Sequence, residues 1–357
     1  MPVGFYIHIP FCLRKCKYCD FFSVEYDEER MNSYVGAVKR NLHRYSACSA
    51  DSVYFGGGTP SLLSAGMVCD ILSEIDLAEG CEVTAECNPS SAGKDKFRGY
   101  LDAGINRLSV GIQSLNDREL KASGRLHNSN EAINTIKSAY SAGFENISAD
   151  IMLGMPYQTI SSLKETLDRI LSLPLTHISA YMLTVAEDTP LASDNVLLAA
   201  SADADTLADM YMLTCEKLEK AGFSHYEVSN FAAEGYECRH NLKYWRCEPY
   251  IGIGTAAHSC YNGKRFYVDN DIDSFINNSE QNEIVSDEAP CDEDERIMLA
   301  LRLKSGIRAA ELHDVLMKKA GSFAEAGFLE IKDGILSLTD KGFLISNEII
   351  CQLTMNS

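Results

Sequence analysis

The chain has 357 residues, of which 46% are hydrophobic and 23% are charged, and it carries a net charge of −19. This length and composition are ordinary for a globular protein with one large domain and a smaller one. The acidic excess and the scattered lysines and arginines argue against general nucleic-acid binding, which uses a basic stripe. Thirteen cysteines, an odd number with irregular spacing, do not indicate a disulfide framework and suit the reducing cytoplasm.

The amino-terminal sequence predicts a strand rather than a targeting segment. Residues 1–11 have no basic region ahead of their apolar residues, so they do not resemble a signal peptide. No apolar run in the chain approaches the length of a transmembrane helix. Residues 3–9 (VGFYIHI) predict a buried strand that leads directly into a cysteine-rich loop.

Three cysteines, Cys12, Cys16 and Cys19, follow this strand with the spacing C-x₃-C-x₂-C. Thiolates are soft ligands for iron, and these gaps let one loop surround three corners of a cubic iron–sulfur cluster. The fourth iron would then be open to another ligand. The alternatives are a structural zinc site or three unrelated core thiols. A zinc site needs a fourth Cys or His close by, and none follows before His43.

Five further strands are predicted in the following sequence, and helical segments separate them. The strands cover residues 52–55, 82–86, 107–112, 147–152 and 177–183, and the clearest helices cover 34–45, 129–142 and 161–173. In the last helix, Ser162 and Glu165 form a capping-box pattern. Alternating strands and helices predict βαβ units and a parallel sheet. Six units are too few for a closed eight-unit barrel, so we expect an α/β fold with a partial, open (β/α)₆ barrel.

Polar or glycine-rich residues stand at the carboxyl ends of five predicted strands. They are the cysteine loop, residues 56–60 (GGGTP), Glu86, Gln113 and Asp150. In parallel barrels this rim carries the active site, so the five features indicate one shared site. Each carboxylate taken alone could equally be a helix cap or a turn residue. Glycines allow a ligand to approach the backbone closely, and a P-loop is excluded because its Lys-Ser/Thr ending is missing.

The pattern changes after residue 230, where the sequence becomes dense in aromatic residues, His and Cys. A glycine-rich loop follows at 252–258, and from residue 291 the sequence predicts a small α+β module. Its helices are expected at 294–302 and 308–316, and Asp333-Gly334 predicts a hairpin. The module resembles a winged helix, and the acidic charge favours packing or partner contact over DNA binding. We therefore expect a core barrel at 1–230, a connecting segment at 231–290 and the module at 291–357.

The cysteine spacing, with Tyr18 before the last cysteine and GGGTP one strand later, resembles the radical S-adenosylmethionine (SAM) superfamily. The resemblance implies a 4Fe-4S cluster on Cys12, Cys16 and Cys19, with SAM bound at the open iron. One electron from the cluster would then break the sulfonium carbon–sulfur bond of SAM.

More specific motifs resemble the branch that contains the oxygen-independent coproporphyrinogen III oxidases. They are YIHIPFC, GGGTPS, the Glu86 strand, G-x-Q at 111–113, Arg125 and D-x₃-G-x-P at 150–156. The resemblance implies that a first SAM contacts Tyr6, Gly57 and Glu86. A second SAM would contact Gly58, Thr59, Gln113, Arg125 and Asp150, and Tyr18 is expected to border the same cofactor site.

Three departures from these oxidases point to their sister group, the HemW-type haem chaperones. Phe21 stands where the oxidases have a further cysteine, His258 stands where they have an apolar residue, and the first strand begins at residue 3 without their extension. The chaperone motif H-N-x-x-Y-W is present at 240–245. It implies haem contacts at His240, Asn241, Tyr244 and Trp245, and we expect a further haem contact at His258.

An imidazole can bind haem iron, and aromatic side chains can pack on the porphyrin. Without the motif, His240 would be read as a hydrogen-bonded surface or core histidine. Cys238 and His258 are further candidate iron ligands, and either could be structural.

The sequence therefore predicts a haem chaperone that binds a 4Fe-4S cluster, SAM and haem and transfers haem to acceptor proteins. SAM cleavage is left open, and SAM with the cluster could control haem release. The alternatives are oxidative decarboxylation of coproporphyrinogen III to protoporphyrinogen IX, or a radical SAM reaction on another small molecule. The expected partners are haem-acceptor proteins and a flavodoxin- or ferredoxin-like electron donor. Transient contact of the chaperone with membrane proteins is compatible with this prediction.

Overall fold

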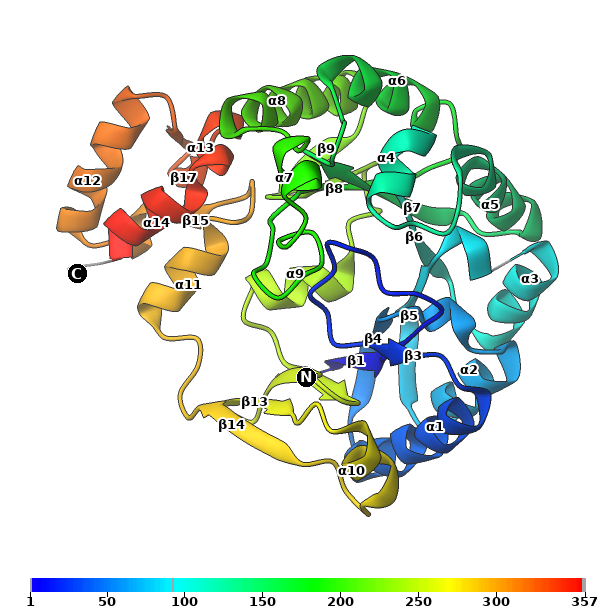
Figure 1. The fold of residues 1–357 in the computed structure, drawn as a ribbon. Coiled ribbons are helices and arrows are strands. Elements are labelled where there is room, and N and C mark those ends of the chain that lie inside the picture. Colours follow the sequence, from blue (N-terminus) through cyan, green and yellow to red (C-terminus); the bar gives the residue numbers. More distant parts are fainter. Residues whose placement is uncertain (1, 92, 355–357) are drawn as a thin grey trace.

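The computed structural model describes residues 2–91 and 93–354, and these residues form a curved sheet with helices along its outer side (Figure 1). The sheet has the strand order β14-β13-β12-β11-β1-β4-β5-β6-β7-β8-β10-β9. The strands from β11 to β8 in this order are parallel to their neighbours. They are β1 (Val3–Ile9), β4 (Ser49–Gly57), β5 (Asp76–Cys87), β6 (Arg107–Gln113), β7 (Asn146–Leu153), β8 (His177–Met182) and β11 (Tyr250–Ile253).

The expected α/β fold with an open parallel barrel is confirmed. All six predicted strands are present, and β1 has the bounds expected from its sequence. The structure adds a seventh parallel strand, because β11 pairs with the free side of β1. The sequence did not predict β11, since its four residues are followed by a glycine-rich segment and its partner lies at the other end of the chain.

Side chains in the barrel strands alternate between an apolar outer side and a polar interior. In β1, Phe5, Ile7 and Ile9 are at most 1% exposed and belong to the main hydrophobic core. Burial of each such side chain stabilises the fold by about 1.5–3 kcal/mol. The intervening Tyr6 and His8 face the interior, where the hydroxyl of Tyr6 lies 3.1 Å from Nδ1 of His8. We call this inner side of the parallel strands the barrel interior.

The outer helices are α1 (Glu28–Leu42), α2 (Ala65–Leu72), α3 (Lys94–Ala103), α4 (Asp117–Ala122), α5 (Ser129–Ala142), α6 (Ile160–Ile170) and α8 (Ala204–Lys220). The predicted helix at 129–142 is confirmed with the same bounds. The capping box predicted from Ser162 and Glu165 is wrong. The cap residue is Thr159, whose hydroxyl accepts from the N–H of Ser162, while the Ser162 hydroxyl accepts from the N–H of Thr159. Similarly, α1 begins after the Asp27 cap rather than at residue 34.

The cysteine loop crosses the open end of the barrel at the carboxyl ends of the strands (Figure 1). The strand β1 ends before the proline at position 10, which has no backbone N–H to donate to a neighbouring strand. The loop is held at its base by the parallel pair β2 (Phe11–Cys12) and β3 (Val24–Glu25). The three cysteines are therefore displayed over the barrel interior.

Antiparallel strands extend both edges of the sheet. At one edge lie β10 (Asn230–Ala232) and β9 (Ser224–Glu227), and at the other lie β12 (His258–Tyr261), β13 (Lys264–Val268) and β14 (Glu283–Asp287). Most of these strands come from the expected connecting segment, which also contains α9 (Arg239–Trp245) and α10 (Ile272–Asn277). The short helix α7 (Asn195–Ala199) precedes α8. The division of the chain at residues 230 and 290 stays a prediction.

The carboxyl-terminal module is a three-stranded sheet packed with helices. Its elements are α11 (Glu293–Ala300), β15 (Ile307–Arg308), α12 (Asp314–Glu325), β16 (Leu329–Lys332), β17 (Ile335–Leu338), α13 (Asp340–Leu344) and α14 (Ser346–Thr354). The predicted hairpin is confirmed: Asp333 and Gly334 have φ values of 53° and 77°, as a two-residue turn of this kind requires. The helix predicted at 308–316 is wrong. Arg308 pairs with Ile335 in the sheet, and α12 begins only after His313.

A partly buried hydrogen-bonded cluster joins this module to the barrel. Nδ1 of His225 on β9 lies 3.1 Å from Oδ1 of Asp340 on α13, and Nζ of Lys304 lies 2.8 Å from the same oxygen. The hydrogen bond from His225 and the one from Lys304 lower the pKa of Asp340 to about 2. The carboxylate therefore favours the docked arrangement of the module and the barrel.

We expect Asp340→Asn to lower the free energy of unfolding by about 1–2 kcal/mol near neutral pH, because it removes the charge from these hydrogen bonds. The folded pKa of Asp340 lies below its usual value of 3.8, so its stabilising effect is complete above about pH 4 and disappears as the pH falls toward 2. Urea unfolding of both proteins measures the difference, which should shrink on acidification. A difference that is zero at pH 7 would contradict the expectation.

Within residues 2–91 and 93–354, no helix combines the length and the apolar composition that a bilayer crossing requires.

Candidate functional site

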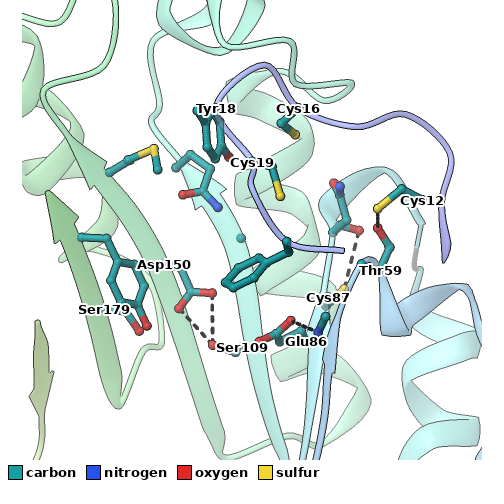
Figure 2. Close-up of a pocket in the computed structure, with 18 of the residues that line it drawn as sticks. Cys12, Cys16, Tyr18, Cys19, Thr59, Glu86, Cys87, Ser109, Asp150 and Ser179 are labelled. Carbon is teal, nitrogen blue, oxygen red and sulfur yellow. Dashed lines mark hydrogen bonds between the residues drawn. The ribbon is translucent and has the colours of Figure 1, made fainter. Parts of the chain in front are cut away.

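A cavity of about 470 Å³ opens at the carboxyl ends of the parallel strands, beneath the cysteine loop. This volume is in the range of small-molecule sites. Figure 2 shows the cysteine loop on one side of the cavity and acidic side chains from the strands on the other. The cavity lies at the rim predicted from the strand ends.

The three loop cysteines line the mouth of this cavity. The hydroxyl of Thr59 donates to Sγ of Cys12 at 3.5 Å, and Nη1 of Arg125 donates to Sγ of Cys16 at 3.5 Å. Burial raises the pKa of Cys19, and the neighbouring thiols Cys16 and Cys12 add to this effect. Each thiol is only partly buried and is thus accessible from the cavity.

Two partly buried carboxylates, Glu86 and Asp150, form the floor of the cavity (Figure 2). Oε1 of Glu86 accepts from the Tyr54 hydroxyl at 3.0 Å, and Oε2 accepts from the backbone N–H of Gly57 at 3.2 Å. Asp150 accepts from the Ser109 hydroxyl at 2.9 and 3.1 Å. Burial, followed by the charge of Asp150, raises the pKa of Glu86 to about 7. This floor favours a ligand that carries a positive charge.

Gly57 has to be a glycine for two reasons. Its φ of 108° lies in the region that other residues rarely adopt, and a Cβ atom there would come within 2.6 Å of the His8 ring. The backbone of β4 therefore passes close to the cavity without a side chain between them. This agrees with the role predicted for the GGGTP segment.

Arg107 is a cavity residue that the sequence reasoning missed. It lies on β6, is 1% exposed, and its Nε and Nη1 atoms have no hydrogen-bond partner among the described residues. Its charge lowers the pKa of both Glu86 and Asp150, against the larger effect of burial. A charged residue at an interior position of an otherwise apolar strand is the signal that could have identified it.

The structure brings together most residues expected to contact SAM. Eight of the nine line the cavity: Tyr18, Gly57, Gly58, Thr59, Glu86, Gln113, Arg125 and Asp150. Tyr6 does not line it and instead stacks against Tyr54 beneath the floor, with 6.2 Å between ring centroids. Arg125 is fixed by donation from Nη2 to the Gly111 carbonyl at 2.5 Å. Cys87 also lines the cavity, but burial raises its pKa to about 12 and its thiol donates to the Asn88 carbonyl.

The residues expected to contact haem are not gathered in the cavity. Only Asn241 lines it. His240 is fully buried, its Nδ1 is 2.9 Å from the Ser52 hydroxyl, and its Nε2 is 2.9 Å from the Tyr244 hydroxyl. Burial lowers the pKa of His240 to about 3, so the ring is neutral.

His240 is thus a hydrogen-bonded core histidine in this structure, which was the alternative interpretation of its sequence. Trp245 is half-buried on the same helix, where its side chain hydrogen-bonds to Glu227. His258 is exposed on β12, with its ring centroid 5.5 Å from that of Tyr267. A role in haem binding stays a prediction for all five residues.

We expect Glu86→Gln to stabilise the ligand-free protein at alkaline pH. The folded pKa of Glu86 is about 7 against an ordinary value of 4.5, so the folded state binds more protons between these values and Glu86 disfavours folding above them. The variant should therefore be more stable than the native protein by about 1–3 kcal/mol at pH 8, and the difference should disappear near pH 5. Urea unfolding at both pH values measures it. A constant difference would contradict this assignment.

Comparisons with known proteins find similar sequences along most of the chain. Residues 6–170 match the Radical SAM superfamily, and residues 294–345 match the HemN C-terminal domain. The chain is 37% identical to the heme chaperone HemW of Haemophilus influenzae over 270 residues, which cover 72% of this chain and 70% of that protein. It is 30% identical to the heme chaperone HemW of Lactococcus lactis over 369 residues, which cover 98% and 96%.

A solved structure, the coproporphyrinogen III oxidase (HemN) from Escherichia coli, is similar in fold. It superposes with a TM-score of 0.82 over 100% of this chain and 91% of that one, at 18% sequence identity.

Proposed function

Since this chain belongs to the HemW family within the radical SAM superfamily, we propose that it is a haem chaperone that transfers haem to acceptor proteins. Similarity to a named haem chaperone along almost the whole chain is the observation that carries this proposal. The three loop thiols above a cavity with an acidic floor support the accompanying cofactors, a 4Fe-4S cluster and SAM.

Cys12, Cys16 and Cys19 would hold the cluster, which supplies single electrons at the mouth of the cavity when bound. The chain's own residues orient SAM. The Glu86 carboxylate is positioned to accept from an amino group, and Gly57 and Gly58 let the ligand reach the backbone. Gln113, Arg125 and Asp150 also line the cavity and offer further polar contacts to SAM. Residues at these positions can hold SAM whether or not it is cleaved.

Haem contact is proposed for the residues around α9 and β12. A histidine binds iron through a free ring nitrogen, and both ring nitrogens of His240 already contact hydroxyl groups. His258 is exposed, and burial of its surroundings lowers its pKa, so it is a neutral imidazole that haem can reach. We therefore propose that His258 binds haem in the conformation described, and that His240 would bind only after α9 moves.

The test compares chaperone and oxidase activities on one anaerobically reconstituted preparation. The proposal expects a Soret shift on haem titration and delivery of haem to an apo-acceptor such as a haem-free cytochrome. It also expects no protoporphyrinogen IX from coproporphyrinogen III with SAM and a reductant. Phe21 lines the cavity where the oxidases have a further cysteine, which supports this distinction. Formation of protoporphyrinogen IX, or a haem titration without spectral change, would overturn the proposal.

The remaining expectations are also proposals. A flavodoxin- or ferredoxin-like protein would reduce the cluster, and the many cysteine thiols of the chain suit the reducing cytoplasm.

A further inference from the structure

Three different kinds of metal ligand meet where the carboxyl-terminal module joins the barrel. They are the thiol of Cys215 on α8, the imidazole of His225 on β9 and the carboxylate of Asp340 on α13. One sulfur, one ring nitrogen and one carboxylate oxygen from these side chains all lie within 4.8 Å of one another. The helices α8 and α13 pack together at this junction (Figure 1), and all three side chains lie outside the cavity described above.

The two ligands from the barrel are deeply buried, and the third lies at the boundary with solvent. Cys215 is 1% exposed and His225 is 5% exposed, whereas Asp340 is partly buried. The ring of His225 stacks on Phe231 with 4.3 Å between centroids, and Phe343 packs against it at 4.9 Å. These contacts hold the ring with its Nδ1 atom directed at the carboxylate.

The hydrogen bonds of His225 show which of its ring nitrogens can bind a cation. The Tyr211 hydroxyl donates its only proton to the Val228 carbonyl at 3.1 Å. The same hydroxyl lies 3.4 Å from Nε2 of His225, where it can only accept, so Nε2 carries a hydrogen. Nδ1 lies 3.1 Å from Oδ1 of Asp340. A bare nitrogen and a carboxylate oxygen repel each other at this distance, so a cation has to lie between them, either a second proton or a metal ion.

We propose that these three side chains bind one Zn²⁺ ion, which takes the place of the proton between Nδ1 of His225 and Oδ1 of Asp340. Thiolate, imidazole and carboxylate are the three ligand types of zinc in proteins, and water would complete the tetrahedron. Ligand atoms on one zinc are about 3.3–3.8 Å apart, given bond lengths of about 2.0–2.3 Å, so small side-chain shifts suffice. Cys215 and His225 each release one proton to solvent when the ion binds.

The charges of the group suit a divalent ion. Without metal, the His225 imidazolium and the Lys304 ammonium face one carboxylate, with Nζ of Lys304 2.8 Å from Oδ1 of Asp340. Zinc brings two positive charges and displaces two protons, so the net charge of this buried group does not change. Lys304 can stay on the carboxylate, and Tyr211 accepts the other ring N–H of His225. Outer-shell partners of this kind orient metal ligands.

The ion would hold the module against the barrel, because α8 and β9 belong to the barrel and α13 belongs to the module. None of its ligands is assigned to the iron–sulfur cluster, SAM or haem. Its failure in an experiment would therefore leave the proposed haem-chaperone function untouched, and the reverse also holds.

The first experiment measures the metal content of the native chain. Anaerobically reconstituted protein is dialysed against dilute Zn²⁺ and then against metal-free buffer, and iron and zinc are determined by elemental analysis. We expect about one zinc ion per chain that is absent from Cys215→Ser and from Asp340→Asn. The matched control is Cys81→Ser, at a buried cysteine whose thiol donates to the Glu82 carbonyl at 3.8 Å, and it should keep this zinc. Zinc bound at the cysteine loop would be common to all four proteins.

The second experiment identifies the ligands with Co²⁺ as a spectroscopic probe. It uses the full chain with Cys12→Ser, Cys16→Ser and Cys19→Ser, which removes the absorption of the cluster. We expect the visible bands of tetrahedral Co²⁺ and a thiolate-to-cobalt charge-transfer band, and equimolar Zn²⁺ should abolish both. In this background, Cys215→Ser should lose the charge-transfer band. Asp340→Asn should keep that band and bind at least about tenfold more weakly.

The two variants differ in how much they disturb the fold. Asparagine has the shape of aspartate, and Asp340 is only partly buried, so Asp340→Asn tests the site even if Cys215→Ser does not fold. The proposal is overturned if the native chain holds no more zinc than Asp340→Asn. It is equally overturned if Co²⁺ binds without a charge-transfer band.

Discussion

Cys16→Ser should yield a folded protein that has lost its cluster. Serine offers a hard hydroxyl in place of a soft thiolate, so one iron of the cluster would lose its protein ligand. The other two thiols cannot replace that ligand. Since even changes around metal ligands lower affinity by about 10–100-fold, we expect iron content to fall by more than about tenfold. SAM binding should fall with it. The loop thiols are partly exposed and outside the hydrophobic core, so stability should change by less than about 1 kcal/mol.

Iron and acid-labile sulfide analysis of anaerobically reconstituted protein measures this effect, and calorimetric titration measures SAM binding. The matched control is Cys87→Ser, because Cys87 lines the same cavity with a thiol that donates to a backbone carbonyl. This control should keep its iron. If Cys87→Ser loses iron as well, the cluster has four protein ligands and no open position for SAM, and the cofactor proposal would fail.

His240→Ala should destabilise the fold strongly, whatever its effect on haem. The substitution removes a fully buried ring that stacks on Tyr54 with 5.3 Å between centroids. It also leaves the hydroxyls of Ser52 and Tyr244 without their hydrogen-bond partner. A large-to-small change with loss of two buried hydrogen bonds should lower the free energy of unfolding by about 2–4 kcal/mol. Urea denaturation of the cluster-free protein measures it.

The comparison with His258→Ala separates structure from haem binding. His258 is exposed, so its removal should change stability by less than about 0.5 kcal/mol. If His258 binds haem iron, this variant should lose the Soret shift while remaining stable. If instead His258→Ala binds haem like the native protein and a still-folded His240→Ala does not, the ligand is His240, and α9 must move to release its ring.

The barrel strands could be predicted because their outer side chains are apolar and bounded by glycine or polar residues. The rim residues Glu86, Gln113 and Asp150 followed from those strand ends, and they do line one cavity. A helix was wrongly expected at 308–316 because the period of its apolar residues fits a helix, whereas pairing with β17 decides the outcome. Such pairing between distant segments is not visible in a local pattern.

Burial was the least predictable property of the site. The motif around His240 indicated haem, but only the fold reveals that its ring is enclosed between Ser52 and Tyr244. Arg107 was missed because its charge within an apolar strand was the only local signal, and the fold is what shows that it lines the cavity. Individual residue types could be assigned to the site, but their accessibility depends on contacts made across the whole barrel.

The polar barrel interior has a consequence for how this chain tolerates change. In an apolar core, substitutions that conserve side-chain volume lower the stability only slightly. Here the inner layer is held by matched donors and acceptors, such as Ser109 with Asp150 and Ser148 with His177. Replacing one inner hydroxyl by a methyl group of similar size would leave its partner without a hydrogen bond, which costs stability. Substitutions that conserve volume are therefore tolerated less well on the inner side than on the outer side. The two sides of one strand therefore tolerate different substitutions: the inner side requires a matching hydrogen-bonding group, and the outer side requires a matching volume.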